Sequence, residues 1–199
     1  MSSTLRLGAY LLCGIVALFE LGVVWLMLHP NVPPDYRAYY IDKTTTCLNQ
    51  PVSGSYKLGT TVRFTPEDKD AAKLIRVCGL EGPTGDGNHA VGTSARLRFV
   101  YAEPATALTL QLAMVAIQKA GAIVPQRVEI VANGTLLDTV SLNAPAPQRF
   151  ALPLVAPADG KLELELRFPD AVPMGPTDPD NRLRSIKLIS AALLPADQV

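Results

Sequence analysis

The chain has 199 residues with 18 basic and 18 acidic side chains, so its formal net charge at neutral pH is zero. This balance gives no indication of nucleic acid or of an anionic surface as a partner. Seventeen prolines and 14 glycines argue against long helices outside one apolar stretch near the N-terminus. The remainder, roughly 155–160 residues, is enough for one domain with a real hydrophobic core.

The apolar stretch is residues 7–28, which hold a single charged side chain, Glu20. As a helix it would extend about 33 Å, enough to cross a hydrocarbon layer of about 30 Å. The run is longer than the apolar region of a secretory signal, and no small-x-small cleavage site follows it. We therefore predict an uncleaved, single-pass anchor in the lipid bilayer, preceded by a short cytoplasmic tail, residues 1–6.

Cys13, Ala17 and Glu20 lie at i, i+4 and i+7 and so share one face of this helix. Small residues let another helix approach closely, and a carboxylate in the bilayer is costly unless it is protonated or paired. One interpretation is a docking face for an integral membrane protein complex. The alternative is a protonated Glu20 tolerated in a lone anchor.

Cys47 and Cys78 are the only cysteines outside the anchor. A pair of cysteines in a domain outside the cytoplasm usually forms a disulfide, so this pairing is predicted here. Two unrelated buried thiols are the alternative. The disulfide would favour placing the domain outside the cytoplasm, because the few basic residues flanking the anchor do not decide its orientation.

After the anchor we expect a proline-rich stalk and irregular segment over residues 29–55, a domain over 56–195 and a tail over 196–199. Leu162, Leu164, Leu166 and Phe168 alternate with charged residues, which is typical of a strand with one buried and one exposed face. Asn133-Gly134 between alternating runs predicts a hairpin. Residues 79–95, rich in glycine, are expected to form a long loop. About eight or nine short strands predict an all-β, antiparallel, jelly-roll-like β-sandwich.

The sequence offers little for catalysis. His89 with Ser94 would be needed for a cryptic hydrolase, and their spacing carries no specificity. Asp180 and Arg182 are expected to form an ion pair that fixes the loop before the last strand; a calcium site at Asp178 and Asp180 is the less favoured alternative. Only Tyr56 and Tyr101 are candidates for stacking on a sugar. We predict no enzyme, no cofactor and no metal.

Several short motifs, taken in order, resemble a periplasmic β-sandwich domain found in bacterial membrane glycosyltransferases and envelope-polysaccharide proteins. They are Tyr56-Lys57-Leu58-Gly59, the series Gly79, Pro83, Gly87, Gly92, Ala95 and Leu97, the hairpin residues Val128, Ile130, Asn133 and Gly134, and finally Phe168-Pro169 and Asp180-x-Arg182. Where the family pattern has tryptophan, this chain has Leu80 and His89, and where it has an acid, the chain has Thr84. The resemblance implies that the fold is kept while its aromatic motif residues are lost.

This resemblance suggests a stand-alone domain on a single-pass anchor in the bacterial inner membrane, with the domain in the periplasm. The first expectation for function is a non-catalytic accessory subunit of a larger membrane complex, in envelope glycan synthesis or export or in a respiratory or photosynthetic complex. The alternative is a membrane-tethered carbohydrate-binding module that contacts a glycan. The second hypothesis predicts an aromatic or polar patch on one sheet face.

Overall fold

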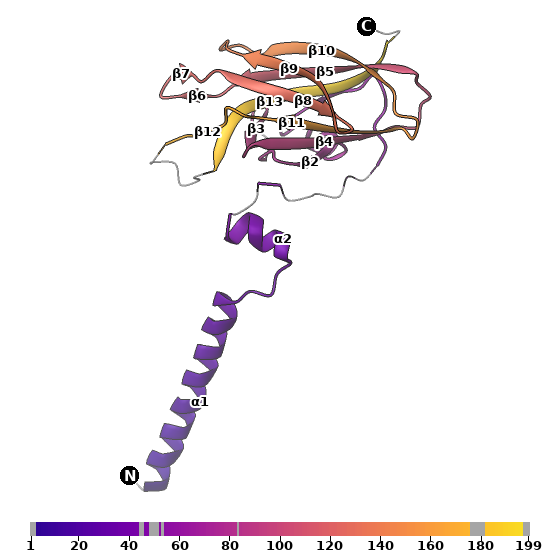
Figure 1. The fold of residues 1–199 in the computed structure, drawn as a ribbon. Helices are drawn as coiled ribbons and strands as arrows, with labels where there is room; N and C mark the ends of the chain where they lie inside the picture. The colour runs from indigo at the N-terminus through magenta and orange to yellow at the C-terminus, as the bar shows by residue number, and fades with distance from the viewer. Residues whose placement is uncertain are drawn as a thin grey trace. The chain divides into compact units, whose positions relative to one another are not determined.

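The chain forms two compact units, Met1–Arg37 and Ala38–Val199. The computed structural model describes residues 3–43, 46–47, 52, 54–82, 84–175 and 182–196 (Figure 1). The first unit is helical, and most of the regular elements of the second are antiparallel strands. This organisation agrees with the predicted apolar helix followed by an all-β domain.

The first unit is built on helix α1, Ser3–Leu28. Its segment Leu7–Leu28 has a mean hydropathy of 2.4 and no buried side chains, so by length and composition it is able to cross a membrane. A short helix α2, Pro34–Tyr36, begins at a proline, which suits a first helical position. A π-helical turn η1, Arg37–Ile41, continues directly from it. Residues 34–41, within the segment expected to form the stalk, are therefore helical.

The first sheet, called sheet A here, has the strand order β1-β13-β5-β10, and β3 and β12 also pair with β13. Every pair in it is antiparallel. Its strands are β1 Thr61–Arg63, β3 Asn88–Val91, β5 Ala107–Ala116, β10 Gln148–Val155, β12 Val172–Pro173 and β13 Leu183–Pro195. The long strand β13 is the centre of the sheet, because it pairs with four of the other five.

The second sheet, sheet B, has the order β2-β4-β11-β8-β9. Its strands are β2 Arg76–Cys78, β4 Ser94–Val100, β8 Gln126–Ala132, β9 Thr135–Leu142 and β11 Lys161–Arg167. The predicted Asn133-Gly134 hairpin joins β8 to β9, and both residues have positive φ. A small separate hairpin pairs β6, Gln118–Lys119, with β7, Ala122–Ile123. Helix α3, Lys69–Lys73, precedes β2.

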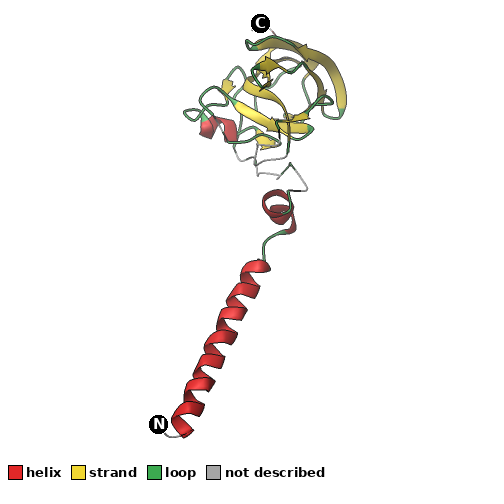
Figure 2. Ribbon diagram, turned by 90° about the vertical axis from the view of Figure 1, so that its left-hand side faces the viewer, coloured by secondary structure: helices red, strands yellow, loops and turns green. Residues whose placement is uncertain are grey.

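The two sheets pack face to face around one hydrophobic core, and Figure 2 shows the strands curving around this shared interior. The leucines of β11 and every second residue of β5 point inward, as their alternation predicts. Phe64, Phe99 and Phe168 are fully buried. The domain is thus an antiparallel, jelly-roll-like β-sandwich.

The glycine-rich stretch over residues 79–95 is not a continuous loop, which corrects the sequence-based expectation. Asn88–Val91 forms β3 and pairs with β13. The short strand was missed because its residues Asn88 and His89 are poor strand formers with no clear alternation. Its partner lies about 100 residues further along the chain, and only that pairing defines the strand.

Candidate functional site

A hollow with a volume of about 600 Å³ lies on the outer face of sheet A. We call it the groove. It crosses four adjacent strands, β1, β13, β5 and β10. The described residues that line it are Thr61, Arg63, Gln111, Leu112, Ala113, Pro147, Arg149, Phe150, Ala151, Ile189, Ser190 and Ala192.

Strand register arranges most of these residues in two parallel rows. The first row contains Arg63, Ser190, Ala113 and Arg149, each paired with the next across neighbouring strands. The second row contains Thr61, Ala192, Gln111 and Ala151 in the same way. Adjacent strands lie about 4.8 Å apart, so three intervals separate the outer members of a row by about 14 Å.

Alternation along each strand explains why these residues face outward. Val62, between Thr61 and Arg63, belongs to the hydrophobic core, and so does Ala191, the neighbour of Ala192. Side chains on either side of a core residue point to the opposite face of the sheet. Ala113 and Ala192 are nevertheless only 7% and 2% exposed. They lie outside the core cluster and form the floor of the groove, where small side chains leave room for an occupant.

Charge in the groove is of one sign. Arg63 and Arg149 are exposed and stand on β1 and β10, at opposite ends of the four-strand path, and no described lining residue is acidic. In the part of the chain that the structure describes, neither arginine forms an ion pair. The groove therefore has two available guanidinium groups.

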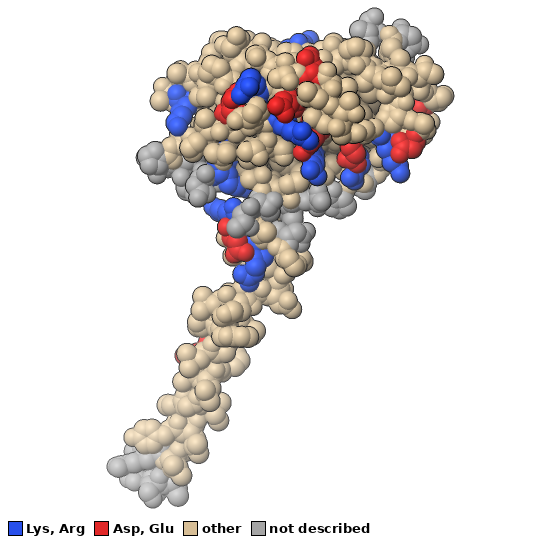
Figure 3. Space-filling model, viewed as in Figure 1, with Lys and Arg blue, Asp and Glu red and all other residues tan. Residues whose placement is uncertain are grey.

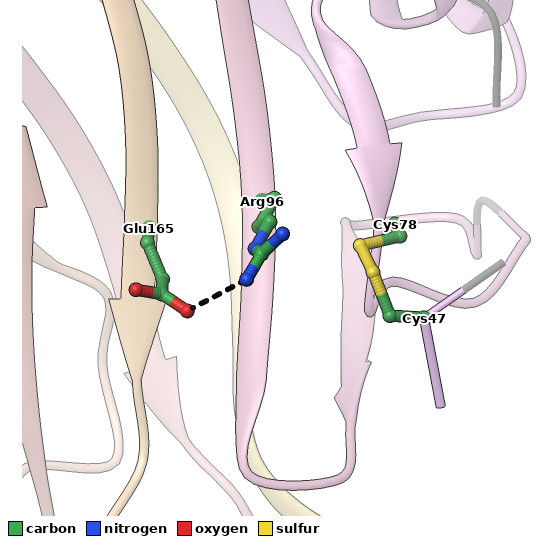
Figure 4. Close-up of a disulfide and its surroundings, with 4 residues drawn as sticks. All are labelled: Cys47, Cys78, Arg96 and Glu165. Atoms are coloured by element: carbon green, nitrogen blue, oxygen red, sulfur yellow. Dashed lines mark hydrogen bonds and ion pairs between the residues drawn. A yellow bond between two sulfur atoms is a disulfide. The ribbon is translucent and has the colours of Figure 1, made fainter. Parts of the chain in front are cut away.

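The outer face of sheet B is different, because its charges are paired across strands. Arg98 pairs with Glu163 at the register position that places them opposite each other. Arg96 lies 3.4 Å from Glu165 (Figure 4). Glu165 also binds Arg167 at 2.8 Å. Figure 3 shows basic and acidic side chains interspersed on one face of the second unit. In these ion pairs the opposite charges offset one another, so no ligand is needed to explain the charged residues on this face.

A second cluster of charge surrounds Glu81. Its carboxylate Oε1 lies 2.6 Å from Arg184 and 3.9 Å from Arg182, and its backbone oxygen accepts a hydrogen bond from Arg76 at 3.2 Å. Arg182 also stacks over the Tyr39 ring at 5.3 Å. The predicted partner of Arg182, Asp180, lies outside the described residues, so the Asp180–Arg182 ion pair stays a prediction.

Both tyrosines considered for sugar stacking are buried, so that expectation is wrong. Tyr56 is 2% and Tyr101 is 6% exposed. The Tyr56 hydroxyl donates to the backbone oxygen of Thr60 and accepts from the Leu193 amide, while its ring packs edge-on against Phe99. Burial raises the pKa of Tyr56, which keeps the hydroxyl neutral. These rings stabilise the sandwich interior.

His89 on β3 does not form the pair that a hydrolase would need. Among the described residues no hydrogen bond joins it to Ser94, the first residue of β4. Burial, reinforced by the charge of Lys187, lowers the pKa of the His89 imidazole. Within the same described ranges, no group of three or more His, Cys, Asp or Glu side chains is arranged to hold a metal ion. Asp178 and Asp180 of the alternative calcium site lie outside those ranges.

The Cys47–Cys78 disulfide is present, as the sequence predicts. It fixes a segment before the sandwich to the last residue of β2, whose neighbour on β4 is Arg96 (Figure 4). Cys13 is a free thiol on α1. Cys13, Ala17 and Glu20 are all exposed on this helix, and their docking role stays a prediction.

No family model and no curated protein matches this sequence. Among solved structures, a family GH115 4-O-methyl-alpha-glucuronidase with specificity for decorated arabinogalactans aligns over 75% of this chain and 19% of its own, with a TM-score of 0.43 and 10% identity. The CBM36-1 domain of a xylanase from the hindgut metagenome of Trinervitermes trinervoides aligns over 67% and 95%, with a TM-score of 0.38 and 13% identity.

A family 35 carbohydrate binding module from an environmental isolate aligns over 76% of this chain and 90% of its own, with a TM-score of 0.34 and 15% identity. The chain thus spans about a fifth of the glucuronidase and most of each binding module. At these TM-scores the likenesses carry no argument about ligand or activity. The strand pairing of the chain itself defines it as a β-sandwich protein with one apolar N-terminal helix.

Sequence reasoning did not identify Arg63, Gln111 or Arg149 as site residues. The available signal was weak: each is the polar member of an alternating strand, as are many ordinary surface residues. What distinguishes them is their common row or face, and that depends on pairings between strands far apart in the sequence.

Proposed function

We propose that this chain is a non-catalytic, membrane-tethered binding module whose β-sandwich holds a glycan chain in the groove on sheet A. The observation that supports this most is the pair of outward-facing rows across β1, β13, β5 and β10. They provide hydroxyl, amide and guanidinium groups above a floor of alanines. Such groups recognise a hydroxyl-rich polymer through hydrogen bonds.

The position of the groove favours a glycan over an extended peptide. An added peptide strand normally pairs with the free edge of a sheet, where backbone groups are unsatisfied. The groove lies instead on the face of sheet A, and β13 and β5 at its centre already pair on both sides. A ligand there has side chains rather than backbone groups to contact.

The helix and the disulfide support a placement at a membrane surface. Leu7–Leu28 suits a membrane span, and a disulfide is typical of a compartment outside the reducing cytoplasm. We therefore propose that the helix anchors the chain in the bacterial inner membrane and that the sandwich works in the periplasm. The module would then keep a glycan close to the membrane.

Binding of the full-length protein in detergent micelles to a panel of immobilised polysaccharides tests this function. Gln111→Leu removes the amide at the centre of the groove with little change in size, and we expect about fivefold weaker binding from the loss of one such hydrogen bond. Thr139→Val removes a polar group from exposed β9 of sheet B and serves as the matched control. If no polysaccharide binds at millimolar concentration, the proposal is rejected.

A second candidate function, docking through the anchor, is favoured by Glu20. This carboxylate is exposed on a helix that is otherwise apolar from residue 7 to residue 28, and it shares a face with the small Cys13 and Ala17. A polar partner on another helix would offset the cost of placing it in lipid. In this role the chain is an accessory subunit of a larger membrane complex.

Co-purification in mild detergent tests the docking role. The double variant Ala17→Leu/Glu20→Leu should lose a stoichiometric partner, whereas Gly22→Leu should keep it. Gly22 is a suitable control because it lies on the opposite face of α1 and has open space around it. Equal recovery of partners from both variants contradicts docking through this face.

A further inference from the structure

We propose that the ligand of the groove is an acidic glycan. Arg63 and Arg149, at opposite ends of the groove, each bind a carboxylate group of this glycan. This inference rests on the proposed glycan-binding function and names the class of ligand. It starts from the charge of the groove, which holds two arginines and no acidic residue among its described lining.

The two arginines are placed for a chain that extends across the sheet. They are the outer members of the same row, joined through Ser190 and Ala113, which are small. Their Cα atoms are therefore about 14 Å apart by strand spacing. A single small anion would reach only one of them well, whereas a polymer lying along the row reaches both.

The small residues between the arginines matter as much as the charges. Ala113 is nearly buried at the floor, and Ser190 adds a hydroxyl in the middle of the row. A ligand can therefore approach the sheet closely while its acidic groups meet the guanidinium groups on either side. The second row adds the Gln111 amide and the Thr61 hydroxyl, which are suited to neutral hydroxyl groups of the same polymer.

The lack of a ring for stacking makes charge the dominant source of affinity. Among the described lining residues the only aromatic one is Phe150, and its side chain packs against the hydrophobic core. A neutral sugar would therefore gain hydrogen bonds but no aromatic contact. An acidic sugar gains charge-assisted hydrogen bonds, which are about twice as strong as neutral ones.

Arginine is well matched to this role. Its planar guanidinium binds a carboxylate through two parallel hydrogen bonds, a geometry that lysine does not provide. The arginines on sheet B have this geometry too, but Glu163 and Glu165 already occupy them. Arg63 and Arg149 have no such carboxylate among the described residues, so an external one completes the arrangement.

The test measures binding of the full-length protein in detergent micelles to four soluble polymers. Polygalacturonate carries carboxylates, dextran sulfate carries sulfates, dextran is neutral, and polyglutamate is an acidic polypeptide. Arg63→Gln and Arg149→Gln are compared with Arg98→Gln on sheet B. We expect polygalacturonate to bind best, with each groove variant at least about fivefold weaker and the control unchanged. Raising the salt from about 0.05 to 0.5 M should weaken wild-type binding and affect the combined Arg63→Gln/Arg149→Gln variant less.

The outcomes separate this inference from the function on which it rests. Dextran binding as tightly as polygalacturonate, with no effect of the arginine variants, overturns the acidic ligand but keeps glycan binding. Tighter binding of dextran sulfate than of polygalacturonate overturns the assignment to carboxylates. Equal binding of polyglutamate overturns the glycan class. No binding of any polysaccharide rejects the proposed function itself, and the inference with it.

Discussion

Glu81 and Arg184 form an ion pair across 103 residues of sequence, with Arg184 donating to the Glu81 carboxylate at 2.6 Å. Glu81 lies in the connection between β2 and β3, and Arg184 lies on β13. The Arg184 side chain is only 9% exposed, so little water screens the pair. This contact therefore links the connection between β2 of sheet B and β3 to β13, the central strand of sheet A.

Replacing Glu81 with glutamine should destabilise the domain, because Arg184 then loses a charged acceptor in a largely buried position. We expect a cost of about 1–3 kcal/mol in the free energy of unfolding. Urea denaturation of the full-length protein in detergent micelles measures it. Glu163→Gln breaks the exposed Arg98–Glu163 pair and should cost within about 0.5 kcal/mol. Equal effects of the two substitutions would contradict the importance assigned to burial.

Removing the disulfide should destabilise the domain much more. Cys47 and Cys78 are separated by 31 residues, and closing a loop of this size contributes about 3–4 kcal/mol in the chain-entropy model. Cys47→Ala/Cys78→Ala removes the bridge without leaving a free thiol. The melting temperature of the full-length protein should fall by roughly 6–16 °C. Cys13→Ala, in the anchor, should leave the melting temperature of the domain unchanged.

Two glycines with positive φ should respond very differently to alanine. At Gly134, in the hairpin turn, an added Cβ meets nothing within 4 Å, so only backbone strain opposes it, at about 1 kcal/mol. At Gly79 the same Cβ would lie 2.2 Å from the Ser94 backbone oxygen and 2.6 Å from the Ala95 Cα. The backbone of β4 would have to move, at a cost above about 3 kcal/mol. Comparable stabilities of the two alanine variants would refute this difference.

Protonation of His89 should make stability depend on pH. Burial, together with the Lys187 charge, lowers its pKa in the folded state below about 6.5, the value expected in the unfolded chain. The unfolded chain therefore binds a proton first, and stability decreases as the pH falls through about 6.5 toward the folded-state pKa. The effect is absent above about pH 7.5, where His89 is neutral in both states.

Glu81, Asp86, Arg184 and Lys187 all act on the His89 pKa, so the origin of this pH dependence needs a control. The hydrogen bond from Lys187 lowers the pKa of Asp86. The contribution of Asp86 to the stability of the folded domain is therefore lost only at a lower pH, below about 4. His89→Gln should abolish the change in unfolding midpoint between about pH 7.5 and 5 and keep the one at lower pH. Persistence of the upper change in this variant would assign it to another group.

The elements whose signal is local can be predicted from the amino-acid sequence alone. The apolar run of α1, the alternation in β11 and the Asn133-Gly134 turn each follow from residues close together in the chain. The Cys47–Cys78 pairing followed from the cysteine count rather than from geometry. The spacing of apolar residues and the residue types of a turn are properties of neighbouring positions in the chain. These features can therefore be predicted without knowing the fold.

The candidate site, in contrast, is defined by the folded chain. Arg63, Ser190, Ala113 and Arg149 come from four strands, and no local pattern indicates that they share a row. The same holds for β3, which exists because β13 pairs with it, and for Tyr56 and Tyr101, which the packing buries. Register between distant strands is set by how both sheets bury their inward faces together, and a shift of one residue would turn every groove side chain into the core.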